Sequence, residues 1–207
     1  MFSDQDLAVM DSIIKRYPRS RSAIMPLLHY VQSKAGYVTN EGIELIAQLL
    51  TIETAEVSAV ATFYTQYKRK PVGEYHVGVC TNTLCAVMGG DAIFAGLKEH
   101  LGIENDGVTA DGKVSLEHIE CNAACDYAPV VMANWEFYDN QTVQSSKDLV
   151  DSMRQGNPTP PTRGPKSLPT WKENSAVLAG INDGRANEGV QAGEPTLLGL
   201  KLAKEGK

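Results

Sequence analysis

Residues 75–85 read YHVGVCTNTLC, a strand pattern that runs directly into a pair of cysteines. The first half of this stretch alternates apolar residues with others, which is the period of a half-buried β-strand. Cys80 ends the pattern, and Cys85 follows it with four residues in between. A helical pattern of apolar residues comes next and ends at Gly102. The sequence therefore predicts a strand and a helix joined by a loop that carries two thiols.

A second pair of cysteines follows a second predicted strand. Residues 114–120 have the strand pattern, and they lead to Cys121 and Cys125, which have three residues between them. The two pairs are 35 residues apart and account for all four cysteines of the chain. We interpret them as a four-thiolate metal site, because paired cysteines in a reducing compartment more often bind metal or do redox chemistry than form disulfides.

Composition places the chain among globular proteins. It has 207 residues, of which 43% are hydrophobic and 21% are charged, enough for one or two compact units. The first residues, MFSDQD, are acidic and lack the pattern of a signal peptide, and no run of about 18 apolar residues is present. We expect a soluble cytoplasmic protein without direct membrane insertion. The net charge of −6 argues against a nucleic-acid partner.

The identity of the metal is only partly indicated by the spacing. All-sulfur tetrahedral sites hold either zinc or iron–sulfur clusters. Zinc sites commonly use two residues between paired cysteines, whereas four residues occur in plant-type [2Fe–2S] ferredoxins. Met88 stands where such a ferredoxin has its third cysteine, and the histidines do not follow a Rieske pattern. Two separate pairs suit the two irons of a binuclear cluster, but structural zinc and a reactive dithiol stay open on the residues alone.

The chain divides into three predicted parts, which together indicate an α/β protein. Residues 1–70 are expected to form an N-terminal helical bundle, residues 71–156 an α/β domain with the cysteines, and residues 157–207 an extended tail. In the bundle, helices are predicted to begin near Ser3, Ser22, Thr39 or Asn40, and Thr54. The last helix of the α/β domain is expected to be capped by Ser145 or Ser146, and residues 130–138 to be β-rich with an interruption near Asn134.

The tail differs from the rest of the chain in composition. It holds six of the ten prolines and no pattern for a core of its own. Seven Lys or Arg against five Asp or Glu give it a net charge of +2, which leaves −8 on residues 1–156. Trp171 is the best candidate in the tail for an anchor in a partner's groove. Phe63 and Tyr64 of the bundle, in contrast, are expected to be core residues.

Several segments of the chain together resemble one known family. They are Arg21–Leu28 (RSAIMPLL), Val60–Tyr64 (VATFY), Pro71–Gly73, Val79–Asn82 and Cys121–Pro129 (CNAACDYAP). The chain resembles the small [2Fe–2S] subunit of respiratory complex I, the bacterial E-type subunit of NADH:quinone oxidoreductase, over about residues 10 to 155. One departure is Ala123, where many members of that family have glycine.

This resemblance implies a fold, a cofactor and partners. The fold is a thioredoxin-like [2Fe–2S] ferredoxin domain behind a helical bundle. The family's four ligands correspond to Cys80, Cys85, Cys121 and Cys125, which would bind one [2Fe–2S] cluster. The implied partner is the subunit that binds FMN and NADH, in a tight heterodimer within the peripheral arm on the cytoplasmic side of the inner or plasma membrane. The chain would act as an electron-transfer subunit of NADH dehydrogenase, with no catalytic residue and no NADH or flavin site of its own.

Two other functions fit the sequence. The same cluster chemistry occurs in the ferredoxin subunit of the diaphorase part of a soluble NAD-linked hydrogenase or formate dehydrogenase. A zinc-stabilised interaction module without redox activity is the third hypothesis. Metal and sulfide analysis separates the third from the first two, and the large subunits that co-purify separate the first two from each other.

Overall fold

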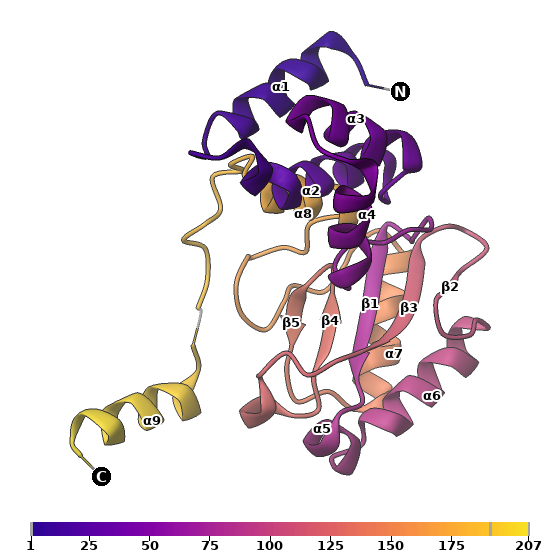
Figure 1. Cartoon of the computed structure of the whole chain (residues 1–207). Helices are drawn as coiled ribbons and strands as arrows, with labels where there is room; N and C mark the ends of the chain where they lie inside the picture. Colours follow the sequence, from indigo (N-terminus) through magenta and orange to yellow (C-terminus); the bar gives the residue numbers. More distant parts are fainter. Residues whose placement is uncertain (1, 191, 207) are drawn as a thin grey trace. The chain divides into compact units, whose positions relative to one another are not determined.

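The computed structural model of the chain describes residues 2–190 and 192–206 and divides into two compact units (Figure 1). The helical unit comprises the residues up to Val72 together with Pro169–Asp183. The sheet unit comprises Gly73–Leu168 and the residues from Gly184 onward. The sequence predicts three consecutive parts, whereas here the last 51 residues are divided between the two units.

The helical unit is built from helices whose ends follow capping rules. It contains α1 (Asp4–Ile14), a 3-10 turn (Ser20–Ala23), α2 (Ile24–Ala35), α3 (Asn40–Leu50), α4 (Thr54–Phe63) and α8 (Trp171–Leu178). Ser3 caps α1 in a capping box with Asp6, and the Thr39 side chain caps α3. Gly36 ends α2 in the left-handed conformation, with φ of 86°. The predicted helices of the bundle are therefore confirmed.

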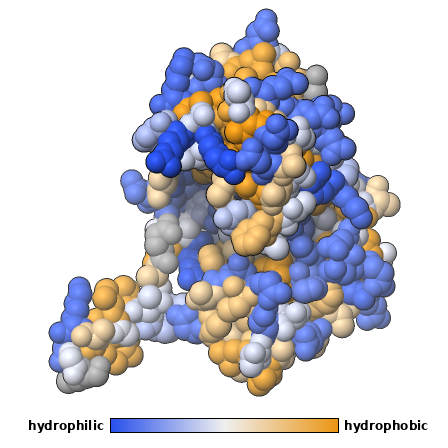
Figure 2. Space-filling view, viewed as in Figure 1, coloured by the Kyte–Doolittle hydropathy of each residue, from blue (hydrophilic) through white to orange (hydrophobic). Residues whose placement is uncertain are grey.

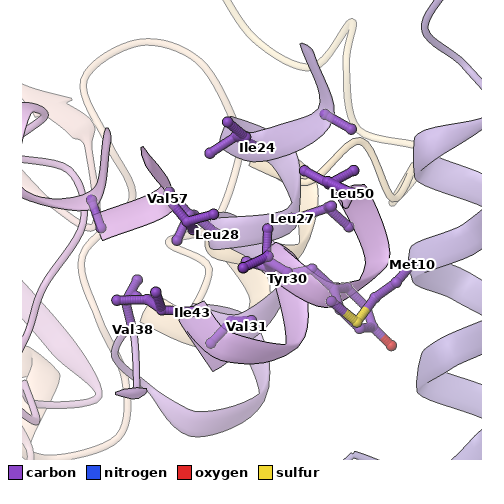
Figure 3. Packing of buried hydrophobic residues seen from close by; sticks show 14 of the residues in the cluster. Met10, Ile24, Leu27, Leu28, Tyr30, Val31, Val38, Ile43, Leu50 and Val57 are labelled. Atoms are coloured by element: carbon purple, nitrogen blue, oxygen red, sulfur yellow. The ribbon is translucent and has the colours of Figure 1, made fainter. Parts of the chain in front are cut away.

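Apolar side chains of these helices meet in one core (Figure 3). Leu27, Leu28 and Val31 of α2 are fully buried, which places α2 at its centre. Met10 of α1, Ile43 of α3 and Val57 of α4 pack around them with the other buried residues of the cluster. Burying side chains of this size stabilises the fold by roughly 1.5–3 kcal/mol each before the loss of conformational entropy.

The expectation that Phe63 and Tyr64 belong to this core is wrong. Phe63 is 77% exposed and Tyr64 is 41% exposed. Both lie at the C-terminal end of α4, where Val57 and Ala61 occupy the positions that face the core. The two rings contact each other edge to face, with centroids 4.9 Å apart.

Trp171 is not an exposed anchor, because the helical unit buries it. It begins α8, which packs against α2, and its side chain is only 2% exposed. The indole N–H donates a hydrogen bond of 2.7 Å to the carbonyl oxygen of Gly36. The expectation of a partner-facing tryptophan is therefore wrong, because this chain itself buries the side chain and accepts its hydrogen bond, from a residue 135 positions earlier in the sequence.

The sheet unit contains a five-stranded mixed sheet in the order β2-β3-β1-β4-β5 (Figure 1). The strands are β1 (Tyr75–Cys80), β2 (Gly107–Val108), β3 (Val114–Ile119), β4 (Val131–Ala133) and β5 (Glu136–Tyr138). β1 and β3 pair in parallel, and the other neighbours pair antiparallel. Asn134 and Trp135, with φ of 49° and 69°, form the two-residue turn between β4 and β5. The interruption predicted near Asn134 is this hairpin turn.

Two helices, α6 (Gly90–Leu101) and α7 (Val143–Arg154), cover one face of the sheet. Their apolar residues pack against alternate residues of β1 and β3, such as Val77 and Leu116. α7 begins earlier than expected, because Thr142 caps it and Ser145 is the third residue of the capping box. The expected cap at Ser145 or Ser146 is therefore wrong, although the helix itself is confirmed.

The opposite face of the sheet holds the first cysteine and a smaller apolar cluster. Cys80, Ile119 and Met132 belong to this cluster. The short helix α5 (Thr83–Val87) and the 3-10 turn Cys125–Tyr127 lie in the loops that follow β1 and β3.

The last helix, α9 (Glu194–Lys204), exposes its leucines to solvent (Figure 2). Pro195 lies within its first turn, a position at which proline suits a helix. Among residues 2–190 and 192–206, no helix has both the length and the apolar character needed to cross a bilayer.

Candidate metal centre

The first cysteine pair lies where β1 ends and α5 begins. Cys80 is the last residue of β1, Cys85 lies within α5, and each is only 2% exposed. The start of α6 packs tightly on this loop, because a Cβ added to Gly90 would lie 2.4 Å from the carbonyl oxygen of Cys80 and 2.9 Å from that of Cys85. A residue without a side chain is required at this close approach.

The second pair lies on the loop after β3 and faces solvent. Cys121 and Cys125 are both exposed, and their sulfur atoms are 3.5 Å apart. Ala123 between them has a left-handed backbone with φ of 55°, and its N–H donates to the Cys121 sulfur at 3.4 Å. This turn therefore directs a backbone donor at a thiol.

The parallel pairing of β1 and β3 brings the two loops to the same edge of the sheet. Cys80 is paired in register with Ile119, so the chain leaves both strands at neighbouring points. Asn82 joins the two loops, since its side-chain amide donates to the Ile119 carbonyl at 3.2 Å and approaches the Cys80 sulfur at 3.9 Å. The sequence prediction that both pairs follow strands is confirmed.

The thiols are close enough to affect one another's ionisation. The pKa of Cys85 is raised to about 11, mainly because the thiol is buried. A hydrogen bond from the Val130 backbone lowers this pKa, while the neighbouring charges of Cys80 and Cys125 raise it. The pKa of Cys125 is raised first by its hydrogen bond with the Cys121 thiol and second by the charge of that side chain. Thiolates that repel each other in this way are stabilised by a metal centre between them, which they bind with release of protons.

The grouping of the thiols in two pairs fits a binuclear cluster. One pair is buried and the other is exposed, and each lies on its own loop. Four thiolates as two pairs are what a [2Fe–2S] cluster takes, with two ligands on each iron.

Sequence reasoning missed an exposed apolar surface at this edge. Leu84, Val87 and Met88 around α5 are 44%, 80% and 56% exposed, so an apolar surface adjoins the first pair. These residues are three and four positions apart, a spacing that places side chains on the same face of a helix, and this is the signal in the sequence that could have predicted the surface. Asp126 accepts a hydrogen bond from Thr196 at 3.0 Å, and Tyr127 packs against Arg163.

Comparisons with known proteins agree with this site. The thioredoxin-like [2Fe-2S] ferredoxin family matches residues 10–154. The E-type subunit of NADH-quinone oxidoreductase from Mycobacterium tuberculosis is 59% identical over 194 residues, 93% of this chain and 77% of that protein. The corresponding subunit from Rickettsia bellii is 41% identical over 156 residues, 74% of this chain and 93% of that protein.

The chain belongs to the thioredoxin-like [2Fe–2S] ferredoxin family of E-type NADH-quinone oxidoreductase subunits. Membership in this family confirms two predictions for the chain: the α/β thioredoxin-like fold, and one [2Fe–2S] cluster as its cofactor. It also decides between iron–sulfur and zinc, which the cysteine spacing left open.

A solved structure shows the same fold at low sequence identity. An NAD+-reducing [NiFe]-hydrogenase in the air-oxidized state superposes with a TM-score of 0.57 at 19% identity. The match covers 69% of this chain and 25% of the hydrogenase chain, so the present chain spans about a quarter of that protein's length. At this identity the likeness concerns the fold alone.

Proposed function

We propose that this chain is the electron-transfer subunit of an NADH:quinone oxidoreductase and binds one [2Fe–2S] cluster through Cys80, Cys85, Cys121 and Cys125. The observation that carries the proposal is the placement of four thiols in two pairs at one edge of the sheet, in a chain 59% identical to the E-type subunit from Mycobacterium tuberculosis. When bound, the cluster accepts and releases one electron at a time.

The chain's own residues would serve this cluster in two ways. The buried pair, Cys80 and Cys85, would hold one iron inside the domain, and the exposed pair, Cys121 and Cys125, would hold the other near solvent. The side-chain amide of Asn82 and the backbone N–H of Ala123 point at sulfurs, and such donors favour the reduced, more negative state. The exposed pair makes this side of the domain the one a redox partner can approach.

The partner that suits this role is the subunit that binds FMN and NADH, in a tight heterodimer that belongs to the peripheral arm on the cytoplasmic side of the membrane. Hydride chemistry would take place on that subunit, while the present chain exchanges electrons with its flavin. The two subunits would together form part of the NADH dehydrogenase module of complex I.

Anaerobic purification followed by metal analysis tests the cofactor and its ligands. We expect about two irons and two sulfides per chain and an S = 1/2 EPR signal after reduction. Serine at any of the four cysteines should lower the iron content or change the EPR spectrum, because an alkoxide is a poorer ligand for iron than a thiolate. Met88→Leu is the matched control, since it removes a sulfur near the first pair that is not proposed as a ligand. Wild-type iron content and spectra in all four serine variants would contradict the ligand assignment.

The second candidate is the ferredoxin subunit of the diaphorase part of a soluble NAD-linked hydrogenase or formate dehydrogenase, favoured by the fold shared with the hydrogenase. Affinity purification from the native membrane in mild detergent distinguishes the two. Membrane-embedded subunits in the purified complex support the first candidate, and hydrogenase or formate dehydrogenase subunits support the second.

A further inference from the structure

The loop that carries the second cysteine pair has little burial of its own. Within Cys121–Tyr127, only Ala124 is buried, and both cysteines are exposed. Ligands hold a cluster in one geometry only when the residues around them are fixed by packing or hydrogen bonds. The anchor of this loop must therefore come from another part of the sheet unit.

Tyr127 connects Cys125 to the rest of the domain. The two residues are the ends of one 3-10 turn, in which the Tyr127 N–H donates to the Ala124 carbonyl at 3.0 Å. The Tyr127 carbonyl in turn accepts from the Asn140 N–H at 2.8 Å. The Cys125 thiol and the Tyr127 ring are therefore carried by the same short turn.

Arg163 lies over the ring of Tyr127. Its guanidinium carbon is 5.0 Å from the centroid of that ring and 4.1 Å from the centroid of Phe137 on β5, so the cation contacts two aromatic faces. Arg163 also donates to Asp139 at 3.0 Å, and the two side chains are only 18% and 8% exposed. This is a largely buried ion pair, not a surface contact.

The main chain holds Arg163 in this position independently of Tyr127. The Thr162 N–H donates to the Phe137 carbonyl at 2.9 Å, and its hydroxyl donates to Asp139 at 2.8 Å. On the other side, the Gly164 N–H donates to the Val190 carbonyl at 2.9 Å. The segment after α7 thus returns to the edge strand β5 and carries the guanidinium to the cysteine loop.

This arrangement has an energetic cost. The Nε atom of Arg163 and the hydroxyl of Tyr127 are buried without a hydrogen-bond partner among the described residues. Unsatisfied buried polar groups destabilise a fold, and buried ion pairs rarely add net stability. A contribution to stability alone therefore does not explain this contact.

We propose that Arg163 is a positioning residue, which clamps the Tyr127 ring, fixes the turn that carries Cys125 and so controls how firmly and in which geometry the [2Fe–2S] cluster is held. This inference rests on the proposed function, because it takes Cys121 and Cys125 as ligands. It gives residues 159–168, which composition describes as tail, a role at the cluster.

The test uses the full chain with its cluster and compares two methionine variants. Arg163→Met removes the clamp and keeps an apolar side chain of similar length. Arg154→Met is the matched control, since Arg154 also forms an ion pair with one aspartate, Asp111, at 2.8 Å. Asp111 precedes strand β3, whereas the loop with Cys121 and Cys125 follows that strand. The measurements are the rate of cluster loss to an iron chelator, followed by visible absorption, and the EPR spectrum of the reduced chain.

Arg163→Met should lose its cluster roughly ten-fold faster than wild type and show a changed EPR line shape, as loss of residues that orient metal ligands does. Arg154→Met should match wild type in both, and Arg163→Lys, which keeps a cation near the rings, should fall between. Equal loss rates and superimposable spectra for the two methionine variants would overturn the proposal.

If Arg163→Met does not fold, Tyr127→Leu removes the same contact from the loop side and carries the same expectation. A wild-type loss rate and spectrum in Tyr127→Leu would then overturn the proposal. A wild-type chain that binds no iron would refute the proposed function itself, so the two failures are distinguishable.

Discussion

His29 is a buried titratable residue in the core of the helical unit. It is 4% exposed, its ring centroid lies 4.7 Å from that of Tyr67, and its Nδ1 atom has no hydrogen-bond partner among the described residues. Burial disfavours the charged imidazolium and lowers the pKa of His29 to about 4. The folded chain therefore keeps this side chain neutral at a pH where the unfolded chain would protonate it.

His29 makes the stability of the chain depend on pH. Because the unfolded state binds a proton near pH 6.5 and the folded state only near pH 4, stability falls as the pH falls through this window. Between pH 7 and pH 5 the loss should be about 2 kcal/mol in the free energy of unfolding. Asp6 and Asp111, whose pKa values are lowered, titrate below this range.

Urea unfolding of wild type and His29→Gln at pH 7 and pH 5 checks this expectation. The variant cannot take up the proton, so its stability should change much less between the two pH values. The same pH dependence in both proteins would show that another group is responsible.

Ala123 has a backbone conformation that favours glycine. Its φ of 55° lies in the left-handed region, where a Cβ costs on the order of 1 kcal/mol. Ala123→Gly should therefore raise the free energy of unfolding by about 0.5–1 kcal/mol. Ala124→Gly is the matched control, because Ala124 has an ordinary backbone φ of −108° and a buried methyl group. Removing this methyl group should destabilise the chain. A destabilised Ala123→Gly would contradict the assignment of strain to this position.

The contact between helix α6 and the first cysteine loop constrains the site. Gly89, with φ of 114°, turns the chain into α6, and Gly90 lies against the carbonyl groups of that loop. The two glycines therefore act as a tight turn and a close-packing position. The helix can approach the loop only while residue 90 lacks a side chain.

Gly90→Ala should destabilise the chain by about 1–3 kcal/mol, because the new methyl group meets backbone oxygens that cannot move independently. It should also speed cluster loss, since the displaced loop carries Cys80 and Cys85. Gly199→Ala on the exposed face of α9 is the control, as nothing lies within 4 Å of its added Cβ. Thermal unfolding and cluster absorbance measure both effects, and a Gly90→Ala protein as stable as the Gly199→Ala protein would refute the contact.

The C-terminal quarter of the sequence contributes to both units of the molecule. Residues 169–183 complete the helical unit through α8, while residues 157–168 follow the edge of the sheet. The Tyr138 hydroxyl donates to the Thr159 carbonyl at 2.6 Å, which adds to the contacts of Thr162 and Arg163. The proline-rich composition of this region therefore describes an extended path and not an absence of structure.

Two truncations separate these contributions. Ending the chain after Gly156 removes Trp171 and should cost the helical unit about 3–5 kcal/mol, the usual loss for a buried tryptophan. Ending it after Asp183 keeps α8 and should leave the helical unit close to its full-length stability. Hydrogen exchange of the α2 amides, which α8 covers, measures the difference. Equal protection of α2 in the two truncated chains would refute this role of α8.

Local patterns in the sequence were enough to predict most elements and the four thiols. The strand that ends at Cys80, the helix capped by Ser3 and the turn at Asn134 all follow from periods and capping rules that act within a few residues. The cysteine pairs could be located for the same reason, because each occupies one loop. Their meeting at one sheet edge follows from the parallel pairing of two predicted strands.

Which surfaces cover one another could not be predicted from such local patterns. The spacing of apolar residues along a helix predicts which side chains will be buried. It does not show whether they pack against this chain or against a partner. Trp171 is buried by α2, Phe63 is left exposed at the end of α4, and Arg163 reaches Tyr127 across 36 residues. Such contacts depend on the three-dimensional path of the whole chain. Composition therefore suggested a tail where the fold places a helix of the bundle and a segment that contacts the turn of Cys125 and Tyr127.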